Sequence, residues 1–233
     1  MLQRIILGLL FCVLVHAEDA CEFEELFNGK SLQGWDGDPV YWSVKDGSIV
    51  GEVTPETLLE RNSFLIWQGG TVGDFELVVE YRVSAKGNSG INYRSVKTPD
   101  LKWSLTGYQA DIDGGDRWTG QNYEERSRKF LAYQGQRVVL KPDAKPELVE
   151  ELGTKGELQK AVKKEDWNTY RIVAIGNVMQ HFVNDVLMSE VEDRDPTKRV
   201  MEGLLGVQVH VGPPMKIEYR SIRFKKIVAA ETK

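Results

Sequence analysis

The sequence predicts an all-β protein, an antiparallel β-sandwich or jelly roll with one short helical connection. Three observations carry this prediction. Apolar and polar residues alternate over several short runs, turn-forming Gly, Asn and Asp residues separate those runs, and helical spacing is confined to residues 146–166. Because no internal repeat or Pro/Ser-rich linker divides the chain, we expect a single domain over residues 18–233.

Short strands broken by turns are expected over residues 23–53. Asn28-Gly29 and Asp46-Gly47 are turn signals, because these residue types tolerate the positive φ that tight hairpin turns need. Trp42 lies in a run that alternates like a buried strand. That pattern favours a place in the core over a place in a ligand groove.

The next strands are predicted at residues 63–70 and 74–83. In the second of them, one face carries an apolar row, which should point into a core: Phe75, Leu77, Val79 and Tyr81. A turn follows at residues 87–90, and alternating runs then continue to Asp113. Gly90 predicts a point where another backbone or a ligand approaches the strand closely.

Two short helical segments are expected between Pro146 and Asp166. Proline opens the sequence PELVEEL at a position that a first helical turn permits, and Leu158, Ala161 and Val162 follow helical spacing. We expect this connection to cross the sheet without chemistry of its own. Strands resume from Trp167, and Asn184-Asp185 predicts a hairpin turn. A lone strand histidine such as His181 is expected to be structural.

The last strands cover residues 203–212 and 217–227. The first of them shows the strongest alternation in the chain, with an apolar row of Leu205, Val207, Val209 and Val211. Gln208 and His210 fall on its opposite face.

The composition indicates a globular protein, with 41% hydrophobic and 28% charged residues in a chain of 233. The net charge of −5 is dispersed, so no nucleic-acid partner is expected. Residues 1–17 read as a signal peptide whose apolar run is too short for a permanent membrane span of ~20 residues. We therefore expect an exported protein, periplasmic or secreted. A lipid anchor on Cys21 is not favoured, because Glu18-Asp19-Ala20 is a poor lead-in to a lipidation site.

In several predicted strands, polar side chains alternate with the apolar ones and so fall on the opposite face. They carry amide, guanidinium, carboxylate and imidazole groups: Asn92, Arg94, Gln109, Asp111, Asp113, Gln208 and His210. If one sheet curves, they can meet on its inner face. Two carboxylates and an imidazole can hold a divalent ion, or can act as general acid and base. The competing interpretation is a solvated sheet face in which Arg94 neutralises Asp111 or Asp113. The sequence has no Gly-rich phosphate loop, so no nucleotide or redox cofactor is expected.

Several motifs in their order resemble the 3-keto-disaccharide hydrolase domain family: LFNGKSLQGW, DFELVVEYRV, GNSGINYRS, GYQADID, YEERSR, DWNTYRIVAIGN and GLLGVQVHVGPPMKIEYRSIRFKKI. The resemblance covers about Phe23 to Ile227. It implies a concanavalin A-like jelly-roll sandwich, exported by bacteria, that acts on sugars oxidised at C3. Relatives remove the C2 hydrogen, expel the C1 substituent and add water to the enone, as 1,2-lyase, as 3-keto-2-hydroxy-glucal hydratase or as net hydrolase, and a divalent metal can take part.

With that resemblance, we assign hypothetical roles to the polar set. Expected catalytic residues are Asp111, His210, Arg94 and Glu124; expected substrate-binding residues are Asn92, Gln109, Gln208 and Tyr123; the expected metal ligands are Asp111, Asp113 and His210. The partner is a small sugar or glycoside, and the leaving group and oligomeric state stay open. The alternative function is a non-catalytic, lectin-like carbohydrate-binding module, because fold alone does not determine function.

Overall fold

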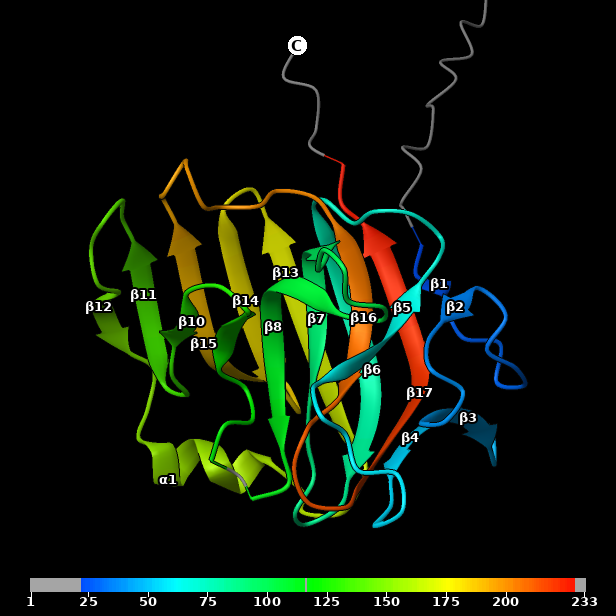
Figure 1. Cartoon of the computed structure of the whole chain (residues 1–233). Coiled ribbons are helices and arrows are strands. Elements are labelled where there is room, and N and C mark those ends of the chain that lie inside the picture. Colours follow the sequence, from blue (N-terminus) through cyan, green and yellow to red (C-terminus); the bar gives the residue numbers. More distant parts are fainter. Residues whose placement is uncertain (1–21, 116, 229–233) are drawn as a thin grey trace, which may run out of the picture.

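Two β-sheets packed face to face make up the protein, shown in Figure 1 as a computed structural model that describes residues 22–115 and 117–228. The predicted signal peptide and Cys21 lie outside the described residues. No helix within the described part is long and apolar enough to cross a membrane.

The larger sheet has ten strands. Nine follow one another in space as β12 (Glu147–Glu151), β11 (Gln136–Leu140), β15 (Val186–Asp193), β14 (Val178–Val183), β13 (Asn168–Ile175), β6 (Phe75–Val83), β17 (Met215–Lys226), β4 (Ser48–Val53) and β3 (Trp42–Lys45), and β1 (Glu24–Glu25) pairs with β17. The smaller sheet has seven strands, in the order β10 (Lys129–Ala132), β9 (Asn122–Glu125), β8 (Leu105–Asp113), β7 (Asn88–Lys97), β16 (Leu204–Val209), β5 (Ser63–Trp67) and β2 (Trp35–Asp36). The pairing is antiparallel except between β11 and β15. The predicted all-β sandwich is confirmed.

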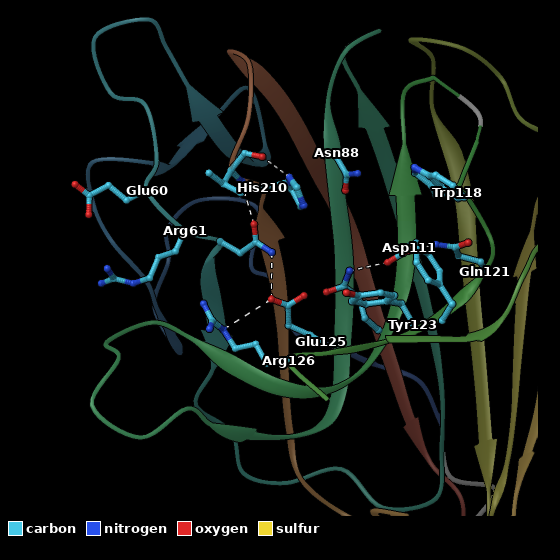
Figure 2. Close-up of a pocket in the computed structure, with 14 residues that line it drawn as sticks. Glu60, Arg61, Asn88, Asp111, Trp118, Gln121, Tyr123, Glu125, Arg126 and His210 are labelled. Atoms are coloured by element: carbon cyan, nitrogen blue, oxygen red, sulfur yellow. Dashed lines mark hydrogen bonds and ion pairs between the residues drawn. The ribbon is translucent and has the colours of Figure 1, made fainter. Parts of the chain in front are cut away.

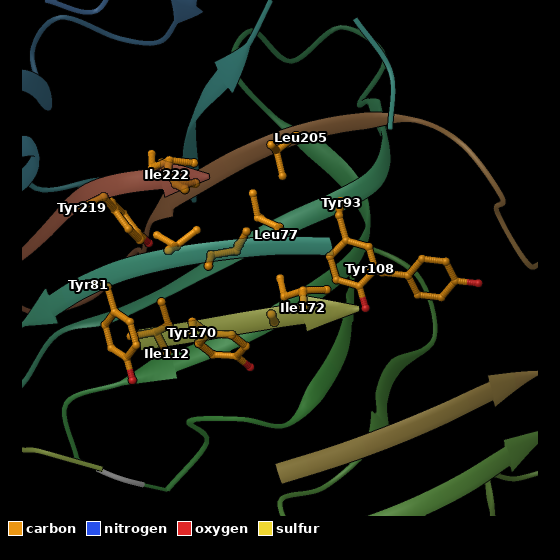
Figure 3. Close-up of a cluster of buried hydrophobic side chains, with 14 of the residues drawn as sticks. Leu77, Tyr81, Tyr93, Tyr108, Ile112, Tyr170, Ile172, Leu205, Tyr219 and Ile222 are labelled. Carbon is orange, nitrogen blue, oxygen red and sulfur yellow. The ribbon is translucent and has the colours of Figure 1, made fainter. Parts of the chain in front are cut away.

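The core lies between the two sheets and follows the predicted alternation (Figure 3). The apolar row of β6 is buried, as predicted, and faces side chains of the smaller sheet such as Tyr93, Tyr108 and Leu205. Trp42 is also buried, which confirms its predicted place in the core. Burying one large apolar side chain contributes about 1.5–3 kcal/mol, so this core supports a rigid sheet beneath the functional face.

Two of the predicted turns are tight hairpins. Asp46 and Gly47 join β3 to β4 with φ of 49° and 73°, and Asn184 and Asp185 join β14 to β15 with φ of 47° and 65°. Both central residues of such a turn need positive φ, which Gly, Asn and Asp supply at little cost. Asn28-Gly29 is a turn as well, but its asparagine side chain bonds to the backbone N–H groups of Lys30 and Ser31 instead of closing a hairpin.

The helical prediction is correct for only one of its two segments. A short helix, α1 (Lys155–Leu158), continues into the 3₁₀ turn η1 (Gln159–Ala161), and Leu158 is buried against the core. The segment that follows Pro146 is instead the exposed edge strand β12. Seven residues are too few for a stable isolated helix, whereas pairing with β11 places Arg137 opposite Glu150 as an ion pair.

Candidate active site

A cavity of about 580 Å³ lies on the face of the smaller sheet that points away from the core (Figure 2). The strands β7, β8, β9 and β10 contribute to it, together with the segment before β5 and the turn after β16. Its lining residues are Glu60, Arg61, Asn62, Asn88, Gln109, Asp111, Trp118, Gln121, Tyr123, Glu125, Arg126, Phe130, His210 and Val211. Polar and aromatic side chains in a hollow of this size suit a small polar ligand.

Asp111 of β8 is a largely buried carboxyl group that lines the cavity. Its Oδ1 accepts a hydrogen bond of 2.6 Å from Gln109 Nε2, and its Oδ2 accepts one from Gln121 Nε2. Burial raises the pKa of Asp111 to about 7, although the two amide hydrogen bonds lower it. Near neutral pH the group therefore exists both as an acid and as a base.

The backbone around Asp111 explains how the two amides reach it. Gly90 of β7 lies opposite Asp111, and a Cβ atom at Gly90 would approach the Cγ and Cδ of Gln109 to 2.6 Å. The missing side chain leaves the space that Gln109 fills. The predicted close approach was that of a backbone or a ligand, and a side chain, that of Gln109, makes it instead. Gln121 is brought in because the backbone of Asp111 bonds to Gly120 and to Gln121.

The side chain of Gln208 orients that of Gln109. Gln208 of β16 is buried and donates from Nε2 to Gln109 Oε1 at 3.0 Å. With its oxygen engaged by Gln208, Gln109 presents its NH₂ group to Asp111. The predicted substrate-binding residue Gln208 therefore lies behind the cavity lining rather than in it.

His210 follows β16 and lines the cavity. Its Nδ1 bonds to the Val211 carbonyl oxygen, and because a carbonyl only accepts, the proton lies on Nδ1. Burial lowers the pKa of His210, while the Val211 bond and the charge of Asp113 oppose that change. The imidazole is thus neutral at neutral pH, with its lone pair on Nε2.

Asn62 and Glu125 complete the polar wall of the cavity. Asn62 Nδ2 donates to Glu125 Oε1 at 3.1 Å, and the backbone N–H of Val211 donates to Asn62 Oδ1 at 3.0 Å. Asn62 therefore ties β9 to the segment that carries His210. Burial raises the pKa of Glu125, which makes it a second carboxyl group of altered acidity in this cavity.

Among the predicted site residues, Gln109, Asp111, Tyr123 and His210 line the cavity together. Asn92 is fully buried beside Ser95 and does not line it. The residues that sequence reasoning missed include Asn62, Trp118, Gln121 and Glu125. Strand alternation could have found Glu125, because it shares a face with Tyr123. Asn62, Trp118 and Gln121 lie outside strands, where no alternation of side chains predicts which way a residue points.

Arg94 was expected beside Asn92 on the cavity face, and that expectation is wrong. A register shift follows Tyr93, and Arg94 has a φ of 45°. Its side chain, 1% exposed, reaches the larger sheet, where it donates to the carbonyls of Gly73 and Gly176 and to Asp74 Oδ1. A bulge of this kind redirects a side chain to the opposite face.

Glu124 also lies away from the cavity, contrary to the expected catalytic position. Neighbouring strand residues point to opposite faces, so Glu124 is directed away from the side of Tyr123. Its carboxylate forms two hydrogen bonds with the guanidinium of Arg128, at 2.6 and 3.1 Å, and Arg128 also contacts Asp193 at 2.6 Å. This buried ion-pair network joins the two sheets.

The three expected metal ligands do not form a ligand set. Both carboxylate oxygens of Asp111 accept amide hydrogen bonds, and Asp113 Oδ2 accepts from the backbone N–H of Arg117 at 2.8 Å. Within residues 22–115 and 117–228, no group of three or more His, Cys, Asp or Glu is placed to hold a metal ion. The residues present do not fit a metal here.

The two packed sheets define a β-sandwich protein of the concanavalin A-like and galectin-like fold class. Sequence comparison assigns the family more closely. The family model for the 3-keto-alpha-glucoside-1,2-lyase-like domain matches residues 22–225, and the chain belongs to that family. The resemblance found in the sequence motifs is confirmed.

Solved structures support the fold assignment. A candidate glycosyl hydrolase from Parabacteroides distasonis is 19% identical, with a TM-score of 0.60 over 90% of this chain and 96% of the other. The carbohydrate-binding module CBM66 from Bacillus subtilis is 14% identical, with a TM-score of 0.55 over 83% and 96%. A Bacillus subtilis protein with a galectin-like fold is 11% identical, with a TM-score of 0.57 over 89% and 100%. None of the curated proteins matches the chain.

Proposed function

We propose that the protein is an exported enzyme that cleaves 3-keto-glycosides by elimination at C1–C2 and hydrates the resulting enone. One observation carries the proposal. The cavity holds a carboxyl group with a pKa of about 7, Asp111, and a neutral imidazole, His210, whose Nε2 can accept a proton. An acid and a base that coexist near neutral pH are what this elimination requires.

In the proposed reaction the ketone at C3 makes the C2 hydrogen acidic. His210 Nε2 removes that proton, the C1–O bond breaks with its electron pair on the departing oxygen, and Asp111 in its acid form protonates this oxygen. The products are an alcohol and a C1=C2 enone. Arg61 and Arg126, which also line the cavity, supply positive charge for the enediolate that develops.

Hydration reverses the same proton movements. Asp111, now ionised, takes a proton from water while the hydroxyl group adds to C1. The imidazolium of His210 returns a proton to C2, and the acid and base regain their starting forms. Elimination followed by hydration equals net hydrolysis, so one cavity can serve both half-reactions.

Purified protein incubated with a 3-keto-glucoside should release alcohol and form the enone, measured by chromatography and ultraviolet absorbance. We expect Asp111→Asn and His210→Ala each to lower kcat about 10²- to 10⁴-fold. Asp46→Asn is the control, because it changes an exposed carboxyl in the β3–β4 turn to a residue that the turn accepts. Wild-type rates in the cavity variants would remove both residues from the mechanism.

A non-catalytic sugar-binding module is the second candidate. The fold shared with CBM66 of Bacillus subtilis favours it, because that fold is used there for carbohydrate binding. Calorimetric binding of a 3-keto-glucoside without release of alcohol or enone would support the module and exclude the enzyme.

A further inference from the structure

Four aromatic side chains form a continuous group that begins in the cavity and extends beyond it. Trp118, Tyr123 and Phe130 line the cavity, and Tyr133 continues past Phe130. The ring of Phe130 lies at the centre, with its centroid 5.7 Å from Trp118, 5.2 Å from Tyr123 and 5.1 Å from Tyr133. We call these four residues the aromatic platform. Figure 2 shows Trp118 and Tyr123 on the same side of the cavity as Asp111.

Two of the four aromatic side chains of the platform are exposed to solvent. Phe130 is 39% exposed and Tyr133 46%, and their rings are stacked at an interplanar angle of 23°. Isolated exposed aromatic residues are ordinary, but a contiguous group that opens into a polar cavity indicates a ligand surface. The two stacked rings, with the rings of Trp118 and Tyr123 beside Phe130, offer an extended apolar area.

The cavity therefore has two chemically different parts. Glu60, Arg61 and Asn62 come from the segment before β5 and form, with His210, a wall suited to sugar hydroxyls. The platform comes from β9, β10 and the segments flanking them. Phe130 also borders a second hollow of about 290 Å³. A group that lies on Phe130 therefore has room to extend out of the first cavity.

We propose that the aromatic platform is the leaving-group subsite and that it takes a planar aromatic aglycone. The proposal rests on the function proposed above and names its substrate class, an aryl glycoside. Phe130, the central ring, offers no hydrogen bond, so it suits a flat apolar group better than a ring of hydroxyls. Aromatic pairs prefer offset stacking or edge-to-face contact at 4.5–7 Å, and a platform of four rings provides both.

The kinetic test compares 4-nitrophenyl and methyl 3-keto-glucosides. Phe130→Ala should raise KM for the aryl substrate about 10-fold, which corresponds to one stacking contact, and leave KM for the methyl substrate unchanged. Phe130→Leu keeps apolar packing but removes the flat ring, so its effect should be intermediate. Phe23→Ala is the matched control, because Phe23 is 38% exposed and lies beside Arg223 and Lys225 of β17.

A binding measurement separates this proposal from the proposed function. Calorimetry with the unoxidised 4-nitrophenyl and methyl glucosides needs no turnover, and Phe130→Ala should weaken only the aryl ligand. Selective aryl binding in an inactive protein would support the subsite and reject the enzyme. If Phe130→Ala weakened binding of the aryl and methyl compounds equally, the sugar ring itself would lie on the platform, and the proposal would be overturned. If neither measurement showed a preference for the aryl compound, the platform would bind no aglycone, and the proposal would also be overturned.

Discussion

Asp111 combines two properties that ordinarily oppose each other. The carboxyl group is largely buried, which disfavours its charged form, yet the hydrogen bonds that it accepts come from Gln109 and Gln121 and favour that form. The charged groups that act on Asp111 are the carboxylates of Glu125 and Asp113, and both raise its pKa. At neutral pH the negative charge of Asp111 is therefore stabilised by the dipoles of two amide groups, and keeping this charge buried lowers the free energy of unfolding.

The pH dependence of stability should reveal this cost. The pKa of Asp111 is about 7 in the folded protein against 3.8 as the ordinary value, so the stabilisation by its neutral form is complete below pH 3.8 and is lost as pH rises through 7. The whole effect is on the order of 4 kcal/mol. The Tm of Asp111→Asn relative to wild type should therefore be higher at pH 8 than at pH 5, measured by circular dichroism, because the amide carries no charge at either pH. The same difference at both pH values would contradict a raised pKa.

At the scale of elements, Arg94 shows how a strand irregularity becomes a structural clamp. The bulge in β7 directs its guanidinium to Gly73 and Asp74 before β6 and to Gly176 between β13 and β14. Asp74 Oδ1 also accepts from the backbone N–H of Gly176 at 2.9 Å. One side chain thus fixes the smaller sheet to two parts of the larger one.

Removing this clamp should destabilise the fold strongly. Arg94→Ala takes away one of the two donors to Asp74 Oδ1 and the side-chain donor to two carbonyl groups, and loss of one partner from a buried ion pair costs about 3–5 kcal/mol. Arg220→Ala breaks the half-exposed pair with Glu80 and the contact of Arg220 with the Trp167 ring, and should cost no more than about 2 kcal/mol. Urea unfolding of both variants measures the difference. Equal effects would mean that the Arg94 contacts contribute little.

Alternation along the strands was sufficient to predict the sandwich, the core row of β6 and the cavity positions of Asp111 and His210. It failed where the period is interrupted. The bulge moved Arg94 to the other face, and the choice of Glu124 overlooked that Tyr123 and Glu125 share the face instead. Residues 147–151 carry a weak helical pattern, but pairing with β11 decides their structure. Asn62 and Gln121 lie outside strands, where tertiary contacts alone place them.

At the scale of the whole molecule, the cavity is assembled from parts of the chain that are far apart in sequence. Residues 60–62, 88–130 and 210–211 meet only after the seven-stranded sheet has formed. Asn62, for example, joins Glu125 to Val211. We therefore expect the site to be lost with the sheet as a unit, since Asn62, Asp111 and His210 lie on or beside three different strands, β5, β8 and β16.

Export is the prediction that concerns the whole chain. Cleavage after Ala17 would remove the charged and apolar leader and leave a mature protein that begins at Glu18. Expression of the full chain in a bacterial host, followed by fractionation and N-terminal sequencing, checks this. Material found outside the cytoplasm that still begins at Met1 would contradict it.

Gly90 has a consequence for genetic screens. Any side chain there would push Gln109 from its place, and Gln109 is one of the two groups that hold Asp111. A search for inactive variants should therefore recover Gly90 substitutions together with those of Asp111 and His210, although glycine contributes no reactive atom. These variants would be inactive because a side chain at position 90 occupies the space that Gln109 needs. Their recovery in a screen would therefore indicate a steric requirement at Gly90 and no catalytic role.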